Sequence, residues 1–86
     1  MQVALPELKQ KVLSVTRSSK LGDKIEDVIL ESDRDDYGAD FLRITVQVKA
    51  LDRTSDSEVE NLMNSIERAV SALDERFPSV RFADAA

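Results

Sequence analysis

Residues 42–49 alternate apolar and polar side chains without a break, and this alternation constrains the fold more than any other feature of the chain. In an extended chain successive side chains point to opposite sides, so the apolar members share one side. These members are Leu42, Ile44, Val46 and Val48. A strand with one apolar side needs a second layer over that side and leaves the other facing water or a polar partner. The run therefore predicts a sheet that is covered on one side only.

Residues 5–20 carry the spacing of an amphipathic helix. Apolar side chains recur there at intervals of three and four, at Leu5, Leu8, Val12 and Val15. Pro6 suits a first helical turn, because the N–H that proline lacks would have no partner there. Gly22 is placed to end this segment.

A second helix is predicted from Ser55 onward. Ser55 and Glu58 have the spacing of a capping box, in which both side chains satisfy backbone donors at a helix start. Pro78 is expected to stop this helix. An apolar stripe at helical spacing, which predicts a core position, follows the cap: Val59, Leu62, Met63, Ile66, Val70, Leu73 and Phe77.

The remaining segments complete an α+β domain. Val28 and Leu30 indicate a strand that begins at Ile25, residues 33–40 are rich in turn formers, and residues 79–83 form a short alternating strand. We expect one domain over residues 1–86, with 84–86 as a short tail. The predicted architecture is a two-layer sandwich in the order α-β-β-α-β, with two helices on one face of a three-stranded, mainly antiparallel sheet. A chain of 86 residues buries little surface alone, so a homodimer is expected.

The composition removes most chemistry that a small domain performs. The chain has no histidine and no cysteine, so zinc sites, serine–histidine pairs and disulfide frameworks are excluded. Its two glycines are isolated and form no phosphate-binding loop. We therefore expect no enzyme activity and no cofactor. The lack of cysteine, of a signal segment and of a membrane span favours the cytoplasm.

Charge is unevenly distributed along the chain. Residues 26–40 hold seven acidic residues and one arginine, a net charge of −6 within an overall charge of −5. Such a chain repels phosphate backbones, which disfavours nucleic acid as a partner. Basic residues gather in the first helix, and they leave open an RNA-binding accessory role through Lys9 and Lys11.

Two apolar residues fall on the polar side of the predicted sheet. Ile29 and Phe41 have the parity opposite to the core residues, and Arg43 shares that side. An apolar spot there would contact a second subunit or another protein. The alternative is that one or both tuck under the hairpin or a chain end.

The acidic hairpin is the other candidate site. Asp35, Asp36 and Tyr37 at its tip are candidates for binding a protein partner. The residues from Asp33 to Gly38 resemble the start of a calcium loop, but Tyr37 and Ile44 stand where that loop needs oxygen ligands. Weak candidates for holding a cation are Asp33, Asp35, Asp36 and Asp40. A solvated turn that keeps the sheet edge from pairing elsewhere is the competing interpretation.

The charged residues near the end of the second predicted helix are expected to be ordinary. Arg68, Arg76 and Arg81 alternate with Glu67, Asp74 and Glu75. This alternation predicts surface ion pairs along a helix.

The order of segments resembles a known domain. Ile25-Glu26-Asp27-Val28, then residues 41–48, then a long helix ending in residues 73–80, look like the cytoplasmic C-terminal domain of cation diffusion facilitator transporters. The resemblance implies a dimerising and metal-sensing unit, although the histidines that bind metal in many such domains are absent. The order is also similar to a type II K-homology module, without its Gly-x-x-Gly loop. A shared fold does not by itself establish a function.

The sequence favours a small acidic protein-interaction module without enzyme activity, which dimerises or docks on a protein. A neutraliser of a basic partner, in the manner of an antitoxin or immunity protein, would use the acidic segment to steer that partner. The alternatives are a metal-responsive dimerisation domain that uses the acidic hairpin, and RNA binding through the first helix.

Overall fold

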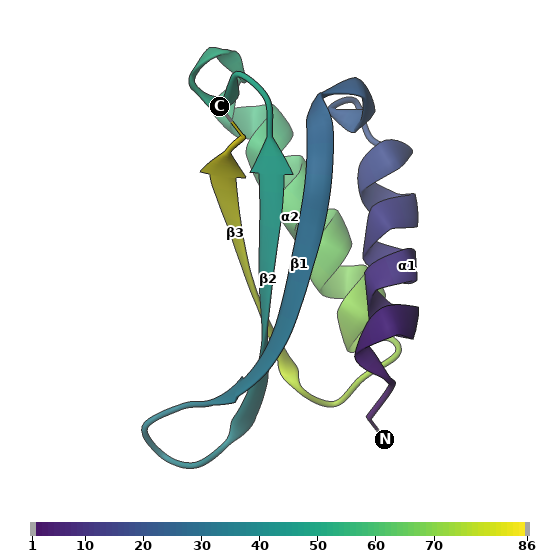
Figure 1. Ribbon diagram of the computed structural model, residues 1–86, viewed down its shortest axis with the longest axis vertical. Helices are drawn as coiled ribbons and strands as arrows, with labels where there is room; N and C mark the ends of the chain where they lie inside the picture. The colour runs from purple at the N-terminus through teal and green to yellow at the C-terminus, as the bar shows by residue number, and fades with distance from the viewer. Residues whose placement is uncertain (1, 86) are drawn as a thin grey trace.

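Two helices pack on one face of a three-stranded sheet, in the order α-β-β-α-β (Figure 1). The structure is a computed structural model and describes residues 2–85. The helices are α1 (Leu5–Arg17) and α2 (Asp56–Ser71); the strands are β1 (Ile25–Arg34), β2 (Asp40–Val48) and β3 (Phe77–Asp84). Two short 3-10 helices, η1 (Gly22–Lys24) and η2 (Leu51–Arg53), lie in the connections. The predicted α+β class and element order are confirmed.

Strand β2 lies at the centre of the sheet. It pairs antiparallel with β1, where Val28 lies opposite Val46, and parallel with β3, where Ile44 lies opposite Val80. The parallel pair is possible because α2 carries the chain back to the end of the sheet at which β2 began. The sheet is therefore mixed, with one antiparallel and one parallel pair.

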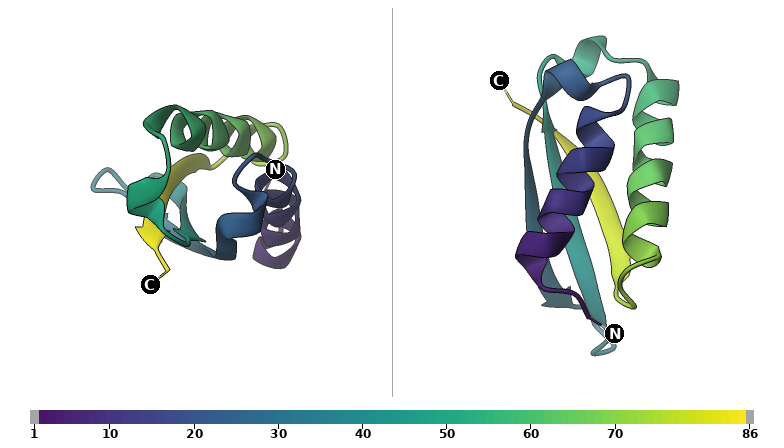
Figure 2. Two further views of the ribbon diagram at one scale, coloured as in Figure 1. Left: turned by 90° about the horizontal axis from the view of Figure 1, so that it is seen from above. Right: turned by 90° about the vertical axis from the view of Figure 1, so that its right-hand side faces the viewer.

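The core lies between the helices and the covered face of the sheet. Figure 2 shows both helices on the same side of the sheet. The alternating residues of β2 supply one wall and the helical stripes supply the other, as the spacing predicts. The buried apolar residues are Leu8, Val12, Leu21, Val28, Leu42, Ile44, Val46, Val48, Leu62, Ile66 and Val70.

Both helices end earlier than the sequence suggests. Helix α1 ends at Arg17 rather than near residue 20, and α2 ends at Ser71 rather than before Pro78. Pro78 is a buried residue of β3 instead of a helix stop. The extension of the α2 stripe was also wrong, because Leu73 is 45% exposed and Phe77 is 66% exposed.

The start of α2 follows the predicted capping arrangement in part. The Ser55 hydroxyl accepts a hydrogen bond from the Glu58 N–H at 3.3 Å. The Glu58 carboxylate accepts from the Ser55 hydroxyl at 3.2 Å, where the capping box predicts a backbone donor. Ser55 therefore fixes both the backbone and the side chain of Glu58. Within residues 2–85, neither helix combines the length and the apolar character needed to cross a membrane.

A buried ion pair closes the end of the domain at which the N-terminus and the hairpin lie (Figure 1). Arg76 Nε and Nη2 donate to the two carboxylate oxygens of Asp74 at 2.9 and 2.8 Å. The side chains of Arg76 and Asp74 are 7% and 0% exposed. The prediction of ordinary surface ion pairs is therefore wrong for Arg76, because the chain folds over this pair after α2 has ended.

The ion pair connects three distant segments. Asp74 Oδ2 accepts from the Val3 N–H at 2.7 Å, and Arg76 Nη2 donates to the Val3 carbonyl at 2.8 Å. Arg76 Nη1 also donates to the Ser32 hydroxyl of β1 at 3.3 Å. Hydrogen bonds from Arg76 outweigh burial and hold the pKa of Asp74 well below its ordinary value.

We predict that Asp74→Asn removes an acid-sensitive part of the stability. Because the folded-state pKa of Asp74 is lowered, its stabilisation is complete above the ordinary pKa of 3.8 and is lost as the pH falls below that value. Urea unfolding at a series of pH values measures this. The variant should lose about 3 kcal/mol at pH 7 and show a shallower decline below pH 4. Asp52→Asn, an exposed carboxylate in η2, is the control and should keep the wild-type profile. Equal acid sensitivity in Asp74→Asn and wild type would contradict the assignment.

We also predict that Gly22→Ala destabilises the fold for a steric reason. A Cβ at Gly22 would lie 2.3 Å from the Arg17 carbonyl oxygen, so the chain between α1 and η1 must shift. The expected loss is about 2 kcal/mol in urea unfolding. Gly38→Ala is the comparison, because Gly38 has a φ of +81° and open space around it. That variant should lose about 1 kcal/mol from backbone strain alone. A Gly22→Ala protein as stable as wild type would rule out the close approach.

Candidate protein-interaction surface

The face of the sheet that the helices do not cover is called the open face. It carries the side chains that alternate with the core residues. Strand β2 contributes Phe41, Arg43, Thr45 and Gln47 to it. The β1 partners of the first three are Asp33, Glu31 and Ile29, and the β3 partners of all four are Phe77, Ser79, Arg81 and Ala83. The sequence predicts which β2 side chains lie on this face, because the residues that alternate with the core residues must point away from the helices.

Two phenylalanines form an aromatic patch at the hairpin end of the open face. Phe41 of β2 lies opposite Phe77 of β3 in the parallel register. Neighbouring strands lie about 4.8 Å apart, so the two rings are adjacent. They border a shallow hollow of about 340 Å³, whose other lining residues include Asp35, Asp40 and Ser79. Exposed aromatic side chains beside charged ones are typical of surfaces that bind proteins.

Ile29 does not join the aromatic patch. It lies opposite Thr45, which is four residues from Phe41 along β2. Ile29 is 38% exposed and lines a separate hollow beside α1, together with Leu5 and Lys9. Ile29 and Phe41 are therefore both on the open face, but they form no common apolar spot. Neither residue is buried under the hairpin or a chain end.

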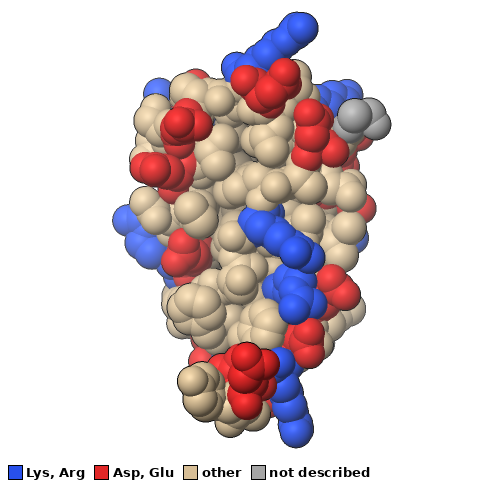
Figure 3. All heavy atoms as spheres, turned by 90° about the vertical axis from the view of Figure 1, so that its left-hand side faces the viewer, with Lys and Arg blue, Asp and Glu red and all other residues tan. Residues whose placement is uncertain are grey.

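Arg43 is held in place beside the aromatic patch. Its guanidinium lies 5.3 Å from the centre of the Phe41 ring, and its Nη2 is 3.1 Å from Asp33 Oδ2. The backbone N–H of Arg34 and the Arg43 guanidinium hold the pKa of Asp33 below its ordinary value. Further along the face, Arg81 Nε donates to the Thr45 hydroxyl at 3.1 Å. Figure 3 shows basic side chains crossing a largely uncharged area, above the charged cluster at the lower end of the molecule.

The three hairpin candidates have different roles in the structure. Asp35 shapes the turn, because its Oδ1 accepts from the N–H groups of Tyr37 and Ala39 at 2.9 Å each. Tyr37 projects from the tip and is 96% exposed. Asp36 is exposed beside it. Asp35 is therefore accounted for by the turn, whereas Asp36 and Tyr37 stay predictions as partner-binding residues.

Much of the acidic segment is neutralised within the chain. Four of its seven acidic residues form ion pairs with lysine or arginine. The pairs are Glu26–Lys49, Asp27–Lys9, Asp33–Arg43 and Asp40–Arg34. These contacts reduce the field that a count of charges along the sequence suggests.

The weak candidates for cation binding do not come together. Among residues 2–85, no group of three or more carboxylates is placed to hold a metal ion. Asp33 contacts Arg43, Asp35 caps the turn, and Asp40 contacts Arg34 at 3.3 Å. Calcium needs six or more oxygen ligands converging on one point. The acidic hairpin has no such arrangement.

Sequence reasoning placed Arg81 in a strand but missed Phe77 as a surface residue of the same strand. The helical spacing of the α2 stripe extends by chance to Leu73 and Phe77, and this hid the change of period. The signal was present, because Phe77, Ser79 and Arg81 alternate with Pro78, Val80 and Phe82. Reading the strand from Phe77 instead of Ser79 would have placed Phe77 beside Phe41.

Comparison with known proteins identifies the fold but not a family. No protein-family model and no curated protein matches the chain. A solved structure on the mode of action of CzrB, a proposed zinc transporter, matches with a TM-score of 0.69 and 17% identity, over 95% of this chain and 93% of that chain. A structure of a variant of MamM-CTD matches with a TM-score of 0.51 and 13% identity, over 96% of this chain and 99% of that chain. The predicted resemblance to the cytoplasmic domain of cation diffusion facilitator transporters is confirmed as a likeness of fold.

We predict that divalent cations do not stabilise this chain. Because the hairpin carboxylates are engaged separately, Ca²⁺, Mg²⁺ or Mn²⁺ at about 5 mM should leave the thermal midpoint unchanged after correction for ionic strength. Differential scanning fluorimetry with matched KCl controls tests this. A rise in the midpoint that Asp35→Asn/Asp36→Asn abolishes would instead establish a cation site at the hairpin.

Proposed function

We propose that this chain is a protein-interaction domain without enzyme activity that pairs with a second copy of itself through the aromatic patch. The observation that carries the proposal is the adjacent pair Phe41 and Phe77, which stands on an uncovered sheet face with Phe77 66% exposed. Leaving Phe77 and part of the half-buried Phe41 ring in water forgoes the free energy that their full burial would supply. A small domain has few other ways to add to its core.

The open face is complementary to itself. When the twofold axis of a face-to-face pair runs across the strands, the strands of the two copies run in opposite directions, and each feature meets what lies on the other side of the axis. With the axis at the aromatic patch, the two patches meet. The hairpin of one copy, with Asp36, then faces the part of the other that carries Arg43 and Arg81. Rings pack against rings and acidic groups approach basic ones in the same arrangement.

The likeness of fold supports the same conclusion. The transporter domains that the chain resembles are dimerising units, and the CzrB structure covers nearly the whole of this chain. The resemblance implies self-association but names no residues, because 17% identity does not allow a carry-over. The residues proposed here come from this chain alone.

The groups available support the proposed lack of enzyme activity. The chain has no histidine or cysteine. Asp74, its most deeply buried carboxylate among the described residues, is locked to Arg76, and its lowered pKa makes it a poor proton carrier. An assembled acid–base pair is therefore not part of the proposal.

The other hypotheses receive less support. A basic partner, as for an antitoxin or immunity protein, would be steered by the acidic segment, yet four of its seven acidic groups are already paired. An RNA-binding first helix would use Lys9, which lies 3.5 Å from Asp27. Both hypotheses predict complexes that moderate salt dissolves. An apolar dimer interface predicts the opposite.

We predict a homodimer that survives high salt and depends on the aromatic patch. Sedimentation velocity should give a dimer in both about 0.1 M and about 1 M NaCl, because apolar contacts are not screened. Phe77→Ser and Phe41→Ser should each weaken dimerisation by about tenfold or more.

Ile29→Ser is the matched control for these variants. It removes an exposed apolar side chain from the same face but outside the aromatic patch. The control should remain dimeric, and circular dichroism should show all variants folded. A wild-type protein that is monomeric at high micromolar concentration, or a dimer unaffected by both phenylalanine substitutions, would refute the proposed interface.

A further inference from the structure

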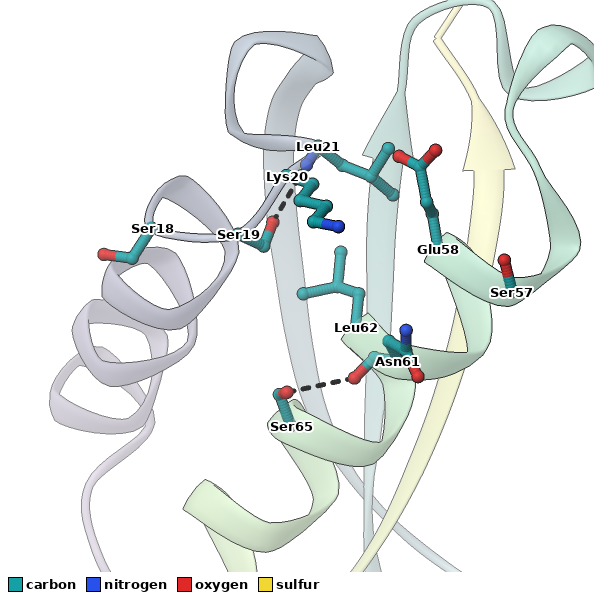
Figure 4. Close-up of a pocket in the computed structure, with 9 residues that line it drawn as sticks. All are labelled: Ser18, Ser19, Lys20, Leu21, Ser57, Glu58, Asn61, Leu62 and Ser65. Atoms are coloured by element: carbon teal, nitrogen blue, oxygen red, sulfur yellow. Dashed lines mark hydrogen bonds between the residues drawn. The ribbon is translucent and has the colours of Figure 1, made fainter.

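A third hollow, of about 460 Å³, lies on the helix side of the domain, away from the open face. It lies between the segment that follows α1 and the first turns of α2, as Figure 4 shows. Small-molecule sites usually have volumes of about 300–1,000 Å³, so this hollow has room for a metabolite. It shares no lining residue with the aromatic patch.

The hollow has an apolar floor and short polar walls. Leu21 and Leu62 lie at its base, and each is 2% exposed. The walls carry small side chains, among them Ser57 and Ser65, which leave the space between the two segments unfilled. The Ser65 hydroxyl donates to the Asn61 carbonyl at 2.9 Å and keeps its lone pairs free to accept. An apolar base below polar walls suits a ligand with one apolar part and a charged head.

One positive and one negative group line this space from opposite sides. Lys20 projects from the segment after α1 and Glu58 from the first turn of α2 (Figure 4). Within residues 2–85 the two form no ion pair with each other, and Lys20 has no other ion-pair partner. The Ser55 hydroxyl holds the Glu58 carboxylate in place at 3.2 Å. The Asn61 side chain stands beside them and can donate and accept hydrogen bonds.

We infer that this hollow binds a free α-amino acid with an aliphatic side chain. Its carboxylate would be bound by the Lys20 ammonium and the Asn61 amide, and its ammonium group by the Glu58 carboxylate. The side chain would rest on Leu21 and Leu62. A zwitterion satisfies both charges at once, whereas a simple anion would be repelled by Glu58 and a simple cation by Lys20. The inference is independent of the proposed dimer, because the two surfaces lie on opposite sides of the sheet.

Titration with leucine, followed by ¹H–¹⁵N NMR, tests the inference on the full chain. Leucine at millimolar concentration should shift the amide signals of Leu21, Asn61 and Leu62 in a saturable manner. Two probes isolate the charges: 4-methylpentanoate lacks the ammonium group, and 3-methylbutylamine lacks the carboxylate. Each should bind about tenfold more weakly than leucine, since each loses one charged contact and faces one like charge. No saturable shift with leucine, or equal shifts with all three compounds, would overturn the inference.

Variants separate a built site from a loose surface contact. Lys20→Met and Glu58→Gln should each weaken leucine binding by about tenfold, and Glu58→Gln keeps an acceptor for the Ser55 hydroxyl. Ser65→Leu should abolish binding by filling the hollow. Lys11→Met and Glu60→Gln are matched controls on α1 and α2 outside the lining, and they should bind leucine normally. If leucine bound equally to wild type and to all three site variants, the ligand would lie elsewhere and the inference would fail.

Discussion

The buried pair of Asp74 and Arg76 determines how the chain leaves α2, and much of the remaining structure depends on it. Its hydrogen bonds reach Val3, Ser32 and the backbone of Arg76 itself. Two charges taken out of water require this many partners, because an incomplete set would cost more than the ion pair gains. The loop is thereby fixed in one conformation, and β3 starts at Phe77. The parallel register that places Phe77 opposite Phe41 follows from that starting point.

The sequence was sufficient to predict the layers of the domain but not this closure. The alternation of β2 and the stripes of both helices are local patterns, and each fixes which side of its element is buried. The pairing of Asp74 with Arg76 is different, because Val3 lies 71 residues from Asp74 and Ser32 lies 44 residues from Arg76. No local pattern distinguishes such a pair from ordinary helix-surface charges. The chance helical spacing of Leu73 and Phe77 is a second, local cause of the misplaced end of α2 and of the missed role of Phe77.

The candidate site shows the same division between local and distant information. Phe41 and Arg43 were predicted for the open face because their parity within β2 is unambiguous. The aromatic patch also needs the parallel pairing of β2 with β3, which brings together residues 36 positions apart. The acidic segment shows the opposite error, since a count of charges along the chain ignores partners such as Lys49 and Lys9 from other elements. Parity predicts the side of a strand, whereas net charge along a segment does not predict the field above it.

The likeness to CzrB at 17% identity shows that this fold forms from very different sequences. Layers and strand order can persist with few shared residues, because they require only apolar side chains at the correct intervals. Paired aromatic rings on an open face require particular residues at two positions. A hollow lined by a lysine and a glutamate that form no ion pair with each other also requires particular residues. The core demands neither feature. Side chains that the core does not need are where the function of a small domain is expected to lie. In this chain the aromatic patch and the hollow lie on opposite sides of the sheet, so the proposed self-association and the proposed ligand binding would not compete for surface.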